Sequence, residues 1–275
     1  MSIEPTRPPV GAHPAPTDTL ARQLAETVTE AGAMALAMFR AGVKSWTKAH
    51  DSPVTEADMA VDRFLNERLS ALAPEAAWLS EESADGPARL AARRLWVVDP
   101  IDGTRAFMAG GADWAVSVAL VQDGRPVLAA LFAPASDELF TAVAGGGATR
   151  NGAPLHAGTR ATLEGAAAAG PAADLDALSR MAEVRRLPRT RSLALRIARV
   201  ATGEIDIAFS GGNSSDWDLA AADLVVHEAA ARLTTREGAL LRYNAPVPRH
   251  APLICAGTTL YPAALDAART AFKRN

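Results

Sequence analysis

Cysteine is almost absent from this chain of 275 residues, which contains only Cys255. A single cysteine cannot close a disulfide within the chain, so a disulfide-stapled scaffold is excluded and a reducing, cytoplasmic compartment is favoured. Cys255 lies in the apolar run 252–256, and this setting predicts a small buried hydrophobic residue rather than a nucleophile.

Long apolar runs and a surplus of one charge are lacking as well. No apolar run approaches the ~18 residues that a membrane helix needs, and the proline-rich residues 1–16 have no apolar stretch typical of a secretory signal. The 28 basic and 31 acidic residues leave a net charge of −3, without the basic surplus of a nucleic-acid-binding protein. We therefore expect no integral membrane segment, no nucleic-acid partner, and a disordered tail over residues 1–16.

Apolar residues make up 49% of the chain, which is enough for the core of a globular protein. They recur at three- and four-residue spacing from Thr17 to Phe39, which predicts a long amphipathic helix with Thr17 or Asp18 as its N-cap. The same pattern predicts helices over residues 55–71, 192–202, 216–229 and 261–272. Short apolar runs predict strands over residues 94–98, 114–122, 125–132, 139–144, 204–209, 231–234 and 252–256.

The order of these elements indicates a mixed α/β (α+β) architecture. Asp123-Gly124 between two strands is a strong hairpin signal, whereas strands alternate with helices in the second half of the chain. We therefore expect a layered fold with two sheets, divided into an N-terminal α+β half over residues 17–155 and a C-terminal α/β half over residues 156–275. The alanine-rich segment 161–173 would connect the two halves.

The segment 96–104 reads Trp-Val-Val-Asp-Pro-Ile-Asp-Gly-Thr, an apolar strand that ends in two carboxylates. Asp99, Asp102 and the outward-turned carbonyl of Ile101 offer a ligand set made only of oxygen, which hard cations such as Mg²⁺ prefer. The Gly103-Thr104 pair would present N–H groups and a hydroxyl to a phosphate at a helix N-terminus. Taken alone, the segment is also compatible with a plain turn, because Asp, Pro and Gly are common turn residues.

Three other acidic clusters lie at the starts or ends of predicted elements. Glu81 and Glu82 follow a short apolar stretch, where a glutamate pair is also compatible with a solvated surface. Asp58 lies at a helix start, where capping and the helix dipole favour an acid in any case. Asp216 alone would serve as the N-cap of the next helix, whereas Asp218, further into that helix, is harder to explain as a cap.

Four segments together resemble the inositol monophosphatase superfamily of Mg²⁺-dependent, lithium-sensitive phosphatases. They are Pro-Val-Thr-Glu-Ala-Asp at 53–58, Ser-Glu-Glu at 80–82, Asp-Pro-Ile-Asp-Gly-Thr at 99–104 and Trp-Asp-Leu-Ala-Ala at 217–221. They occur in the order of the family, and the resemblance covers residues 18–270. It implies a layered αβαβα sandwich in which two sheets lie between helix layers.

The resemblance also implies a role for each matching residue. The implied ligands of two or three Mg²⁺ ions are Glu81, Asp99, the carbonyl of Ile101, Asp102 and Asp218. The implied catalytic residues are Asp58 and Thr104, which would position and deprotonate the attacking water, with Glu82 alongside as an orienting group. Substrate contacts are implied for Glu81, Ile101, Asp102, Gly103, Thr104 and Asp218. The N-terminal half would thus hold most of the metal ligands, and the C-terminal half would complete the active site.

The residues in and around these motifs distinguish three groups of enzymes in the superfamily, which act on different substrates. Enzymes that act on inositol phosphates usually carry an acid seven positions before Asp218, where this chain has Gly211. Histidinol-phosphate phosphatases share the spelling at 99–107 but usually have Tyr in place of Trp217. The bisphosphate nucleotidases fit best, which implies removal of the 3′-phosphate of adenosine 3′,5′-bisphosphate. The segments that carry this fit are 52–55, 79–82, 133–134 and 214–218.

Other interpretations stay open, namely an inositol-1-monophosphatase, a histidinol-phosphate phosphatase and a non-catalytic Mg²⁺-binding relative. The oligomeric state is open too, a homodimer included. Ser192 and Ser214 are expected near the mouth of the site, where they would contact a nucleoside.

A Gly-Gly pair usually closes the family's last motif helix, so Glu-Ala-Ala-Ala at 228–231 predicts an altered helix exit. No role is expected for the histidines, which lie outside the four motifs: His13, His50, His156, His227 and His250.

Overall fold

A seven-stranded sheet forms the larger half of the protein in a computed structural model, which describes residues 16–42, 44–47 and 53–272. Its strands follow the order of the chain, β3 and β4 being parallel and every other neighbouring pair antiparallel. The strands are β3 (Ala77–Ser80), β4 (Arg94–Asp102), β5 (Ala115–Gln122), β6 (Arg125–Ala133), β7 (Glu138–Val143), β8 (Gly147–Arg150) and β9 (Ala153–Pro154).

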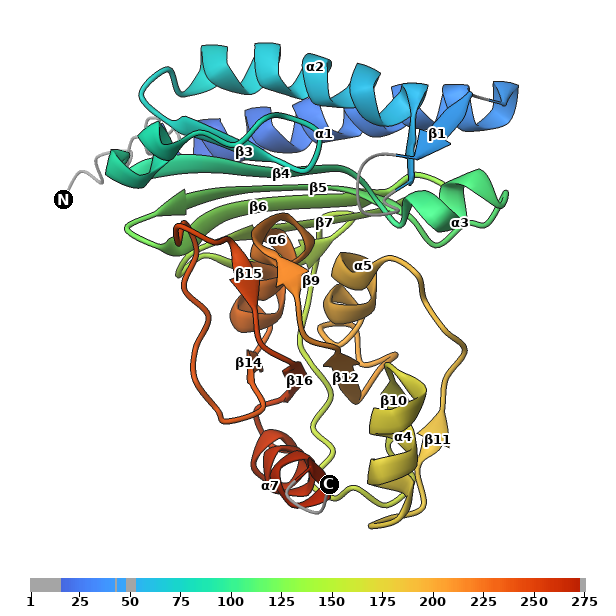
Figure 1. Ribbon diagram of the computed structural model, residues 1–275. Helices are drawn as coiled ribbons and strands as arrows, with labels where there is room; N and C mark the ends of the chain where they lie inside the picture. Colours follow the sequence, from blue (N-terminus) through green and yellow to red (C-terminus); the bar gives the residue numbers. More distant parts are fainter. Residues whose placement is uncertain (1–15, 43, 48–52, 273–275) are drawn as a thin grey trace, which may run out of the picture.

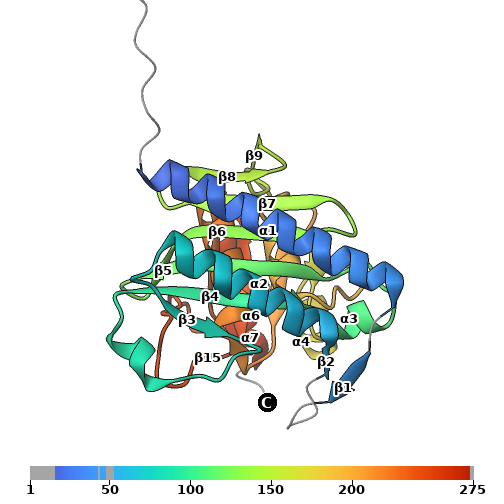
Figure 2. The same cartoon turned by 90° about the horizontal axis from the view of Figure 1, so that it is seen from above.

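Two long helices, α1 (Pro16–Ala41) and α2 (Glu56–Leu72), lie side by side across one face of this sheet (Figures 1 and 2). The apolar stripe of α2, which includes Leu65, packs on β4, and that of α1, which includes Leu24, packs on β5, β6 and β7. Before α2 the chain forms a short antiparallel pair, β1 (Ser45–Thr47) with β2 (Pro53–Thr55).

Strand β4 is buried on both faces, which explains its unbroken apolar sequence. Side chains alternate along a strand, so Leu95 and Val97 enter a second core on the opposite face of the sheet. There they meet α5 (Leu193–Ala198) and α6 (Asp216–Glu228). The strand runs on to Asp102, four residues beyond the predicted end at Val98, because the acidic motif is itself part of β4.

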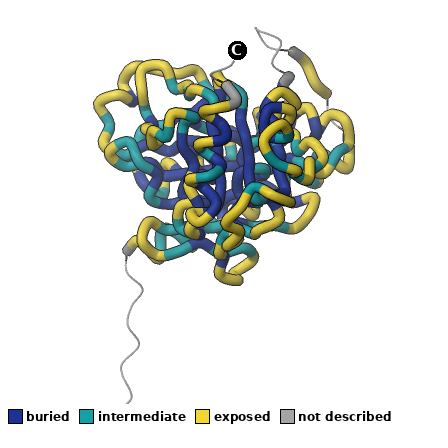
Figure 3. Tube along the Cα trace, turned by 90° about the horizontal axis from the view of Figure 1, so that it is seen from below, coloured by how far each residue is buried: buried dark blue, intermediate teal, exposed yellow. Residues whose placement is uncertain are grey.

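A second sheet of five strands, in the order β11-β10-β12-β16-β14, closes the other side of this helix layer (Figure 1). Its far face carries α4 (Ala172–Ser179) and α7 (Tyr261–Phe272) around a third core. Three cores between five layers confirm the αβαβα sandwich, and burial follows the interior strands of both sheets (Figure 3). The strands are β10 (Ala167–Ala169), β11 (Arg185–Arg186), β12 (Ile207–Ser210), β14 (Ala231–Thr235) and β16 (Leu253–Gly257).

The alanine-rich segment 161–173 is more than a connection, and this prediction was wrong. It contains β10 and the start of α4, and β10 pairs with both β11 and β12. Alanine has a low strand propensity, so sequence pattern gave no strand signal here. Its small side chains suit β10 nevertheless, because all three residues of this strand are buried between helix layers.

The N-terminal prediction needs a second correction. Helix α1 begins at Pro16, so Thr17 and Asp18 lie in its first turn rather than capping it. The tail over residues 1–15, like His13 and His50, lies outside the described residues.

Cys255 is buried in β16, as predicted. Within residues 16–42, 44–47 and 53–272, no helix combines the length and apolarity that crossing a membrane requires. The division into halves at residue 155 stays a prediction.

The exit of α6 shows what replaces the usual glycines. Ala229 caps the helix, and Ala230 then adopts a left-handed φ of 62°, a conformation that costs a residue with a Cβ about 1–2 kcal/mol. The carboxylate of Glu228 accepts hydrogen bonds from the N–H groups of Gly145 and Gly147, both at 2.9 Å, and so ties the helix end to the β7–β8 turn.

We expect Ala230→Gly to raise the free energy of unfolding by about 0.5–1 kcal/mol, because relief of the left-handed strain exceeds the entropy that glycine adds to the unfolded chain. Ala229→Gly is the matched control and should destabilise the protein, since the φ of Ala229 is −93° and its methyl group is buried. Urea unfolding followed by circular dichroism measures both. Equal losses at the two positions would contradict this account of the helix exit.

Candidate active site

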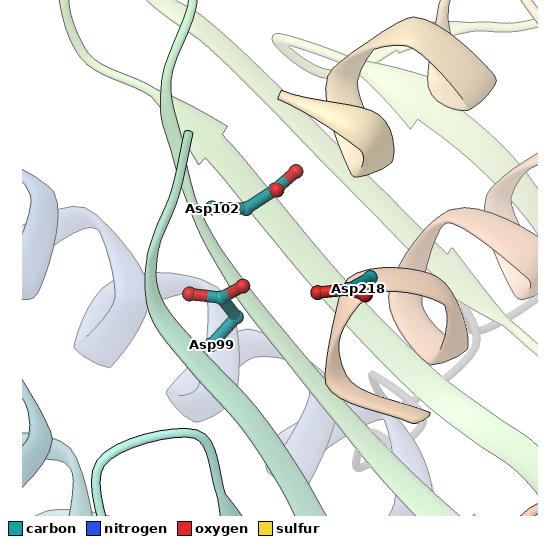
Figure 4. Close-up of side chains that lie close together, drawn as sticks. All are labelled: Asp99, Asp102 and Asp218. Atoms are coloured by element: carbon teal, nitrogen blue, oxygen red, sulfur yellow. The ribbon is translucent and has the colours of Figure 1, made fainter. Parts of the chain in front are cut away.

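Asp99 and Asp102 lie where β4 leaves its regular pairing. Asp99 pairs with Ser117 of β5 and Asp102 with Ala115, so β4 advances three residues while its partner advances two. Residues three apart in a regular strand point to opposite faces of the sheet. The irregularity therefore lets both carboxylates point to the face of the sheet that carries α5 and α6 (Figure 4).

Helix α6 supplies a third carboxylate. Ser215 is its N-cap, and the Ser215 N–H donates to the Asp218 carboxylate at 2.7 Å in a capping box, so Asp218 is a capping residue after all. Asp216 was predicted as the N-cap but is the first helical residue. One carboxylate oxygen from each of Asp99, Asp102 and Asp218 lies within 4.8 Å of the other two (Figure 4).

Burial and mutual repulsion make ionisation of this cluster costly. Burial, followed by the charges of Glu81, Asp102 and Asp218, holds the pKa of Asp99 well above its usual range. Burial raises the pKa of Asp218 to about 7, and the charge of Asp102 adds to this shift. Burial also raises the pKa of Asp102, against the hydrogen bonds that its carboxylate accepts from Ser192 and Ala194.

This donor set fits a hard divalent cation. Its atoms are all oxygen, and buried carboxylates that repel one another are what a bound cation stabilises. The carbonyl of Ile101 lies at the same strand end, and its oxygen is 3.1 Å from the Thr104 hydroxyl oxygen. Three of the predicted metal ligands are thus brought together, and Glu81 lines the same cavity outside that close cluster.

The predicted catalytic pair is also in contact. Helix α3 (Thr104–Met108) follows directly on β4, and the Thr104 hydroxyl lies 3.3 Å from Oδ1 of Asp58. The other oxygen of Asp58 accepts hydrogen bonds from the N–H and hydroxyl of Thr55 at 2.8 and 2.5 Å, in a capping box that starts α2. Burial raises the pKa of Asp58, which makes it a stronger base when ionised.

Gly103 makes the tight step from β4 into α3. Its φ is 99°, and a Cβ at this position would lie 2.8 Å from the carbonyl oxygen of Asp113. Only glycine therefore fits between β4, α3 and the chain before β5 without a shift of the backbone. The predicted helix N-terminus at Gly103-Thr104 is confirmed.

The loop after β3 carries the two glutamates, and Asp62 of α2 holds it in place. Asp62 accepts hydrogen bonds from the hydroxyls of Ser80 and Ser83 at 2.5 and 2.7 Å. Glu81 reaches the cavity, whereas Glu82 is not among the residues that line it. Sequence reasoning missed Asp62, although its position one helical turn after Asp58 was a usable signal.

A buried arginine joins this loop to the start of α6. Arg89, in the short helix η2 (Pro87–Ala91), donates to both carboxylate oxygens of Asp85 at 2.6 and 2.8 Å and to the side chain of Asn244 at 2.7 Å. The N–H of Asn244 donates to Asp216 at 2.8 Å, and Nε2 of His250 lies 2.7 Å from the same carboxylate. His250 thus braces the helix that carries Asp218, a contact that the sequence did not predict.

The acidic cluster opens into a cavity of about 370 Å³. Its wall contains the expected residues Glu81, Asp99, Asp102, Gly103, Thr104 and Asp218, together with Arg105, Arg189 and Arg191. The three arginines were not predicted from the sequence, although the basic run at 185–191 was a usable signal. Ser192 and Ser214, expected near the mouth, are both buried, so that prediction was wrong.

Comparison with known proteins decides which group of proteins shares this arrangement. The family model described as "Inositol monophosphatase family" matches residues 14–271. The chain belongs to the inositol monophosphatase family. This membership accounts for both the five-layer fold and the order of the four motifs.

Individual members of the inositol monophosphatase family carry different activity names. An inositol-1-monophosphatase from Rhizobium meliloti is 36% identical over 195 residues, which cover 67% of this chain and 73% of the relative. A 3′(2′),5′-bisphosphate nucleotidase CysQ from Aggregatibacter actinomycetemcomitans is 29% identical over 238 residues, 83% of this chain and 88% of the relative. The crystal structure of the extragenic suppressor protein suhB from Bartonella henselae superposes with a TM-score of 0.81 at 27% identity, covering 93% of this chain and 99% of that chain. Membership in the family therefore does not by itself select a substrate.

Proposed function

We propose that this chain is a Mg²⁺-dependent phosphomonoester hydrolase that removes the 3′-phosphate of adenosine 3′,5′-bisphosphate, giving AMP and phosphate. The observation that carries the proposal is the convergence of Asp99, Asp102 and Asp218 within 4.8 Å beside the Thr104–Asp58 pair. Hydrolysis of a phosphomonoester needs both a cation site and groups that orient and deprotonate a water.

Each residue has a distinct part in the proposed reaction. Mg²⁺ held by the carboxylates, with the Ile101 carbonyl and Glu81, would supply positive charge for the phosphate and acidify water. Thr104 donates its hydroxyl hydrogen to Asp58 and accepts a hydrogen bond from the attacking water, which fixes the direction of attack. Asp58 takes up the proton as the new P–O bond forms in line with the ester bond that breaks.

Two observations support the nucleotide substrate. Gly211 has no side chain to bind the hydroxyls of a polyol, although a Cβ built there would meet no atom within 4 Å. The CysQ relative, named a 3′(2′),5′-bisphosphate nucleotidase, aligns with 83% of the chain. Inositol 1-phosphate is the second candidate, because the relative named for that activity has the higher identity, 36%.

Two further alternatives have less support. The sequence at 99–107 favours histidinol phosphate as the substrate, whereas Trp217 does not. A non-catalytic Mg²⁺-binding relative would not need Thr104 in contact with Asp58, yet this contact is present at 3.3 Å.

A phosphate-release assay tests the metal-dependent reaction. We expect turnover to vanish in EDTA, to return with millimolar Mg²⁺ and to fall with added Li⁺. Full turnover in EDTA would overturn the metal mechanism. Dependence on Mg²⁺ without sensitivity to Li⁺ would contradict only the lithium sensitivity carried over from the family.

The same assay with adenosine 3′,5′-bisphosphate, inositol 1-phosphate and histidinol phosphate tests the substrate. A site matched to one set of polar groups leaves groups unpaired when another ligand binds, so we expect kcat/KM for the bisphosphate to be at least about tenfold the value for inositol 1-phosphate. A preference for the inositol ester would overturn the nucleotide assignment and leave the phosphatase proposal in place.

A further inference from the structure

The cavity has an acidic floor and a basic rim. The floor consists of Asp99, Asp102 and Asp218, which are buried or half-buried. The rim consists of Arg105, Arg189 and Arg191, all of them exposed. A ligand that reaches from floor to rim therefore meets a metal site at one end and guanidinium groups at the other.

The rim is fixed to the floor by hydrogen bonds rather than carried on a free loop. The hydroxyl of Ser192, next to Arg191 in the chain, donates to the Asp102 carboxylate at 2.6 Å. The N–H of Arg191 donates to the Asp113 carboxylate at 2.5 Å, and its guanidinium donates to the carbonyl of Arg105 at 2.9 Å. Arg191 thus joins the segment before α5 to α3 and places Arg105 and Arg189 at the same opening.

Two of the rim arginines have no partner for their side chains among the described residues. The side chains of Arg105 and Arg189 make no hydrogen bond or ion pair with any described residue. Arg186, on the same basic segment, is by contrast paired with Asp176 at 2.6 Å. Guanidinium groups bind phosphate with two parallel hydrogen bonds, so two unoccupied ones at a cavity mouth are suited to a phosphate.

We propose that Arg105 and Arg189 form an anion subsite that binds a second phosphate of the substrate, distinct from the phosphate that is cleaved on the acidic floor. This inference rests on the proposed function and deepens it, since it makes a bisphosphate, rather than a monophosphate, the substrate class of the site. A second phosphate carries about two negative charges that an inositol or nucleoside monophosphate lacks.

The test compares two substrates that differ only at the second phosphate, adenosine 3′,5′-bisphosphate and adenosine 3′-monophosphate. In Arg189→Ala and Arg105→Ala, kcat/KM should fall at least about tenfold more for the bisphosphate than for the monophosphate, mainly through KM. Arg185→Ala is the matched control, because it removes an exposed arginine from the same segment but not from the cavity wall. Equal losses on both substrates would place the arginines on the cleaved phosphate and overturn the subsite.

A binding measurement separates failure of the subsite from failure of the proposed function. Titration calorimetry with adenosine 5′-monophosphate in EDTA reports on the rim, because EDTA removes the cation that would hold a phosphate on the floor. Arg189→Ala should weaken this binding about tenfold or more, and Arg185→Ala should match the wild type. No binding by the wild type, or no change in Arg189→Ala, would overturn the subsite. Rim-dependent binding without turnover of any ester would overturn the proposed function alone.

Discussion

Asp99→Asn should abolish Mg²⁺ binding and greatly reduce catalysis while making the metal-free protein more stable. Asp99 is buried, and its pKa is held well above the usual range by burial and by the charges of Glu81, Asp102 and Asp218. Asparagine keeps the oxygen that accepts the Ile101 N–H at 3.0 Å but removes the repelled charge. The native carboxylate therefore costs stability in the absence of metal and is explained by the cation that it binds.

The expected sizes make the two effects separable. Turnover at saturating substrate should fall by roughly 10²–10³-fold or more, the scale of losing a main electrostatic group of a reaction centre. The free energy of unfolding in EDTA should rise by about 0.5–2 kcal/mol. In the wild type, Mg²⁺ at a hundredfold excess over its Kd should add about 2.7 kcal/mol of stability, and the variant should gain nothing. Urea unfolding with EDTA or Mg²⁺ measures both changes without any substrate.

Asp174→Asn provides the matched control. Burial raises the pKa of Asp174 as it does that of Asp99, but the Asp174 carboxylate accepts a hydrogen bond from the Arg236 guanidinium at 2.5 Å, and this positive partner opposes the shift. The same substitution should here lower stability and leave the response to Mg²⁺ intact. If Asp99→Asn destabilised the metal-free protein as Asp174→Asn does, the cluster would not be under electrostatic strain. Binding of Mg²⁺ by Asp99→Asn with wild-type affinity would remove Asp99 from the proposed ligands.

The parts of the site that sequence could predict are those encoded locally. Thr55 and Asp58, like Ser215 and Asp218, are cap and third residue of a helix start, and this spacing alone orients each carboxylate. Asp99 and Asp102 follow an apolar run, so their position at the end of a strand could also be predicted. Bringing these segments to one point required the resemblance to the family, because no local pattern fixes the distance between separate elements.

The parts that sequence missed depend on contacts between distant segments. Arg189 reads as one charge in a solvated run until Ser192 is seen to hydrogen-bond Asp102, 90 residues away in the chain. Asp216 reads as a helix cap, whereas folding uses its carboxylate to bind Asn244 and His250. Strand β10 is missed for another reason, since three alanines carry little strand propensity and only burial on both faces selects them.

Thr104→Ala should lower kcat by about 10²-fold or more while leaving the affinity for Mg²⁺ nearly unchanged. Thr104 is uncharged, and its hydroxyl contacts Oδ1 of Asp58 at 3.3 Å and the carbonyl of Ile101 at 3.1 Å. Without this hydroxyl, water has no group that both holds it in line and relays its proton to Asp58. Asp218→Asn should have the converse signature, weaker Mg²⁺ binding, because it removes a charge from the ligand cluster.

Two further variants separate chemistry from packing at this position. Thr104→Ser keeps the hydroxyl and should recover most of the activity, whereas Thr104→Val keeps the shape and should remain as impaired as Thr104→Ala. Calorimetric titration of Mg²⁺ and kcat at saturating metal are measured for all three. If Thr104→Val retained wild-type kcat, the Thr104–Asp58 contact would be a structural feature of the α3 start and water activation would need another base. Equal loss in Thr104→Ser and Thr104→Val would instead mean that the hydroxyl acts only when the methyl group of Thr104, held in a buried site, fixes its position.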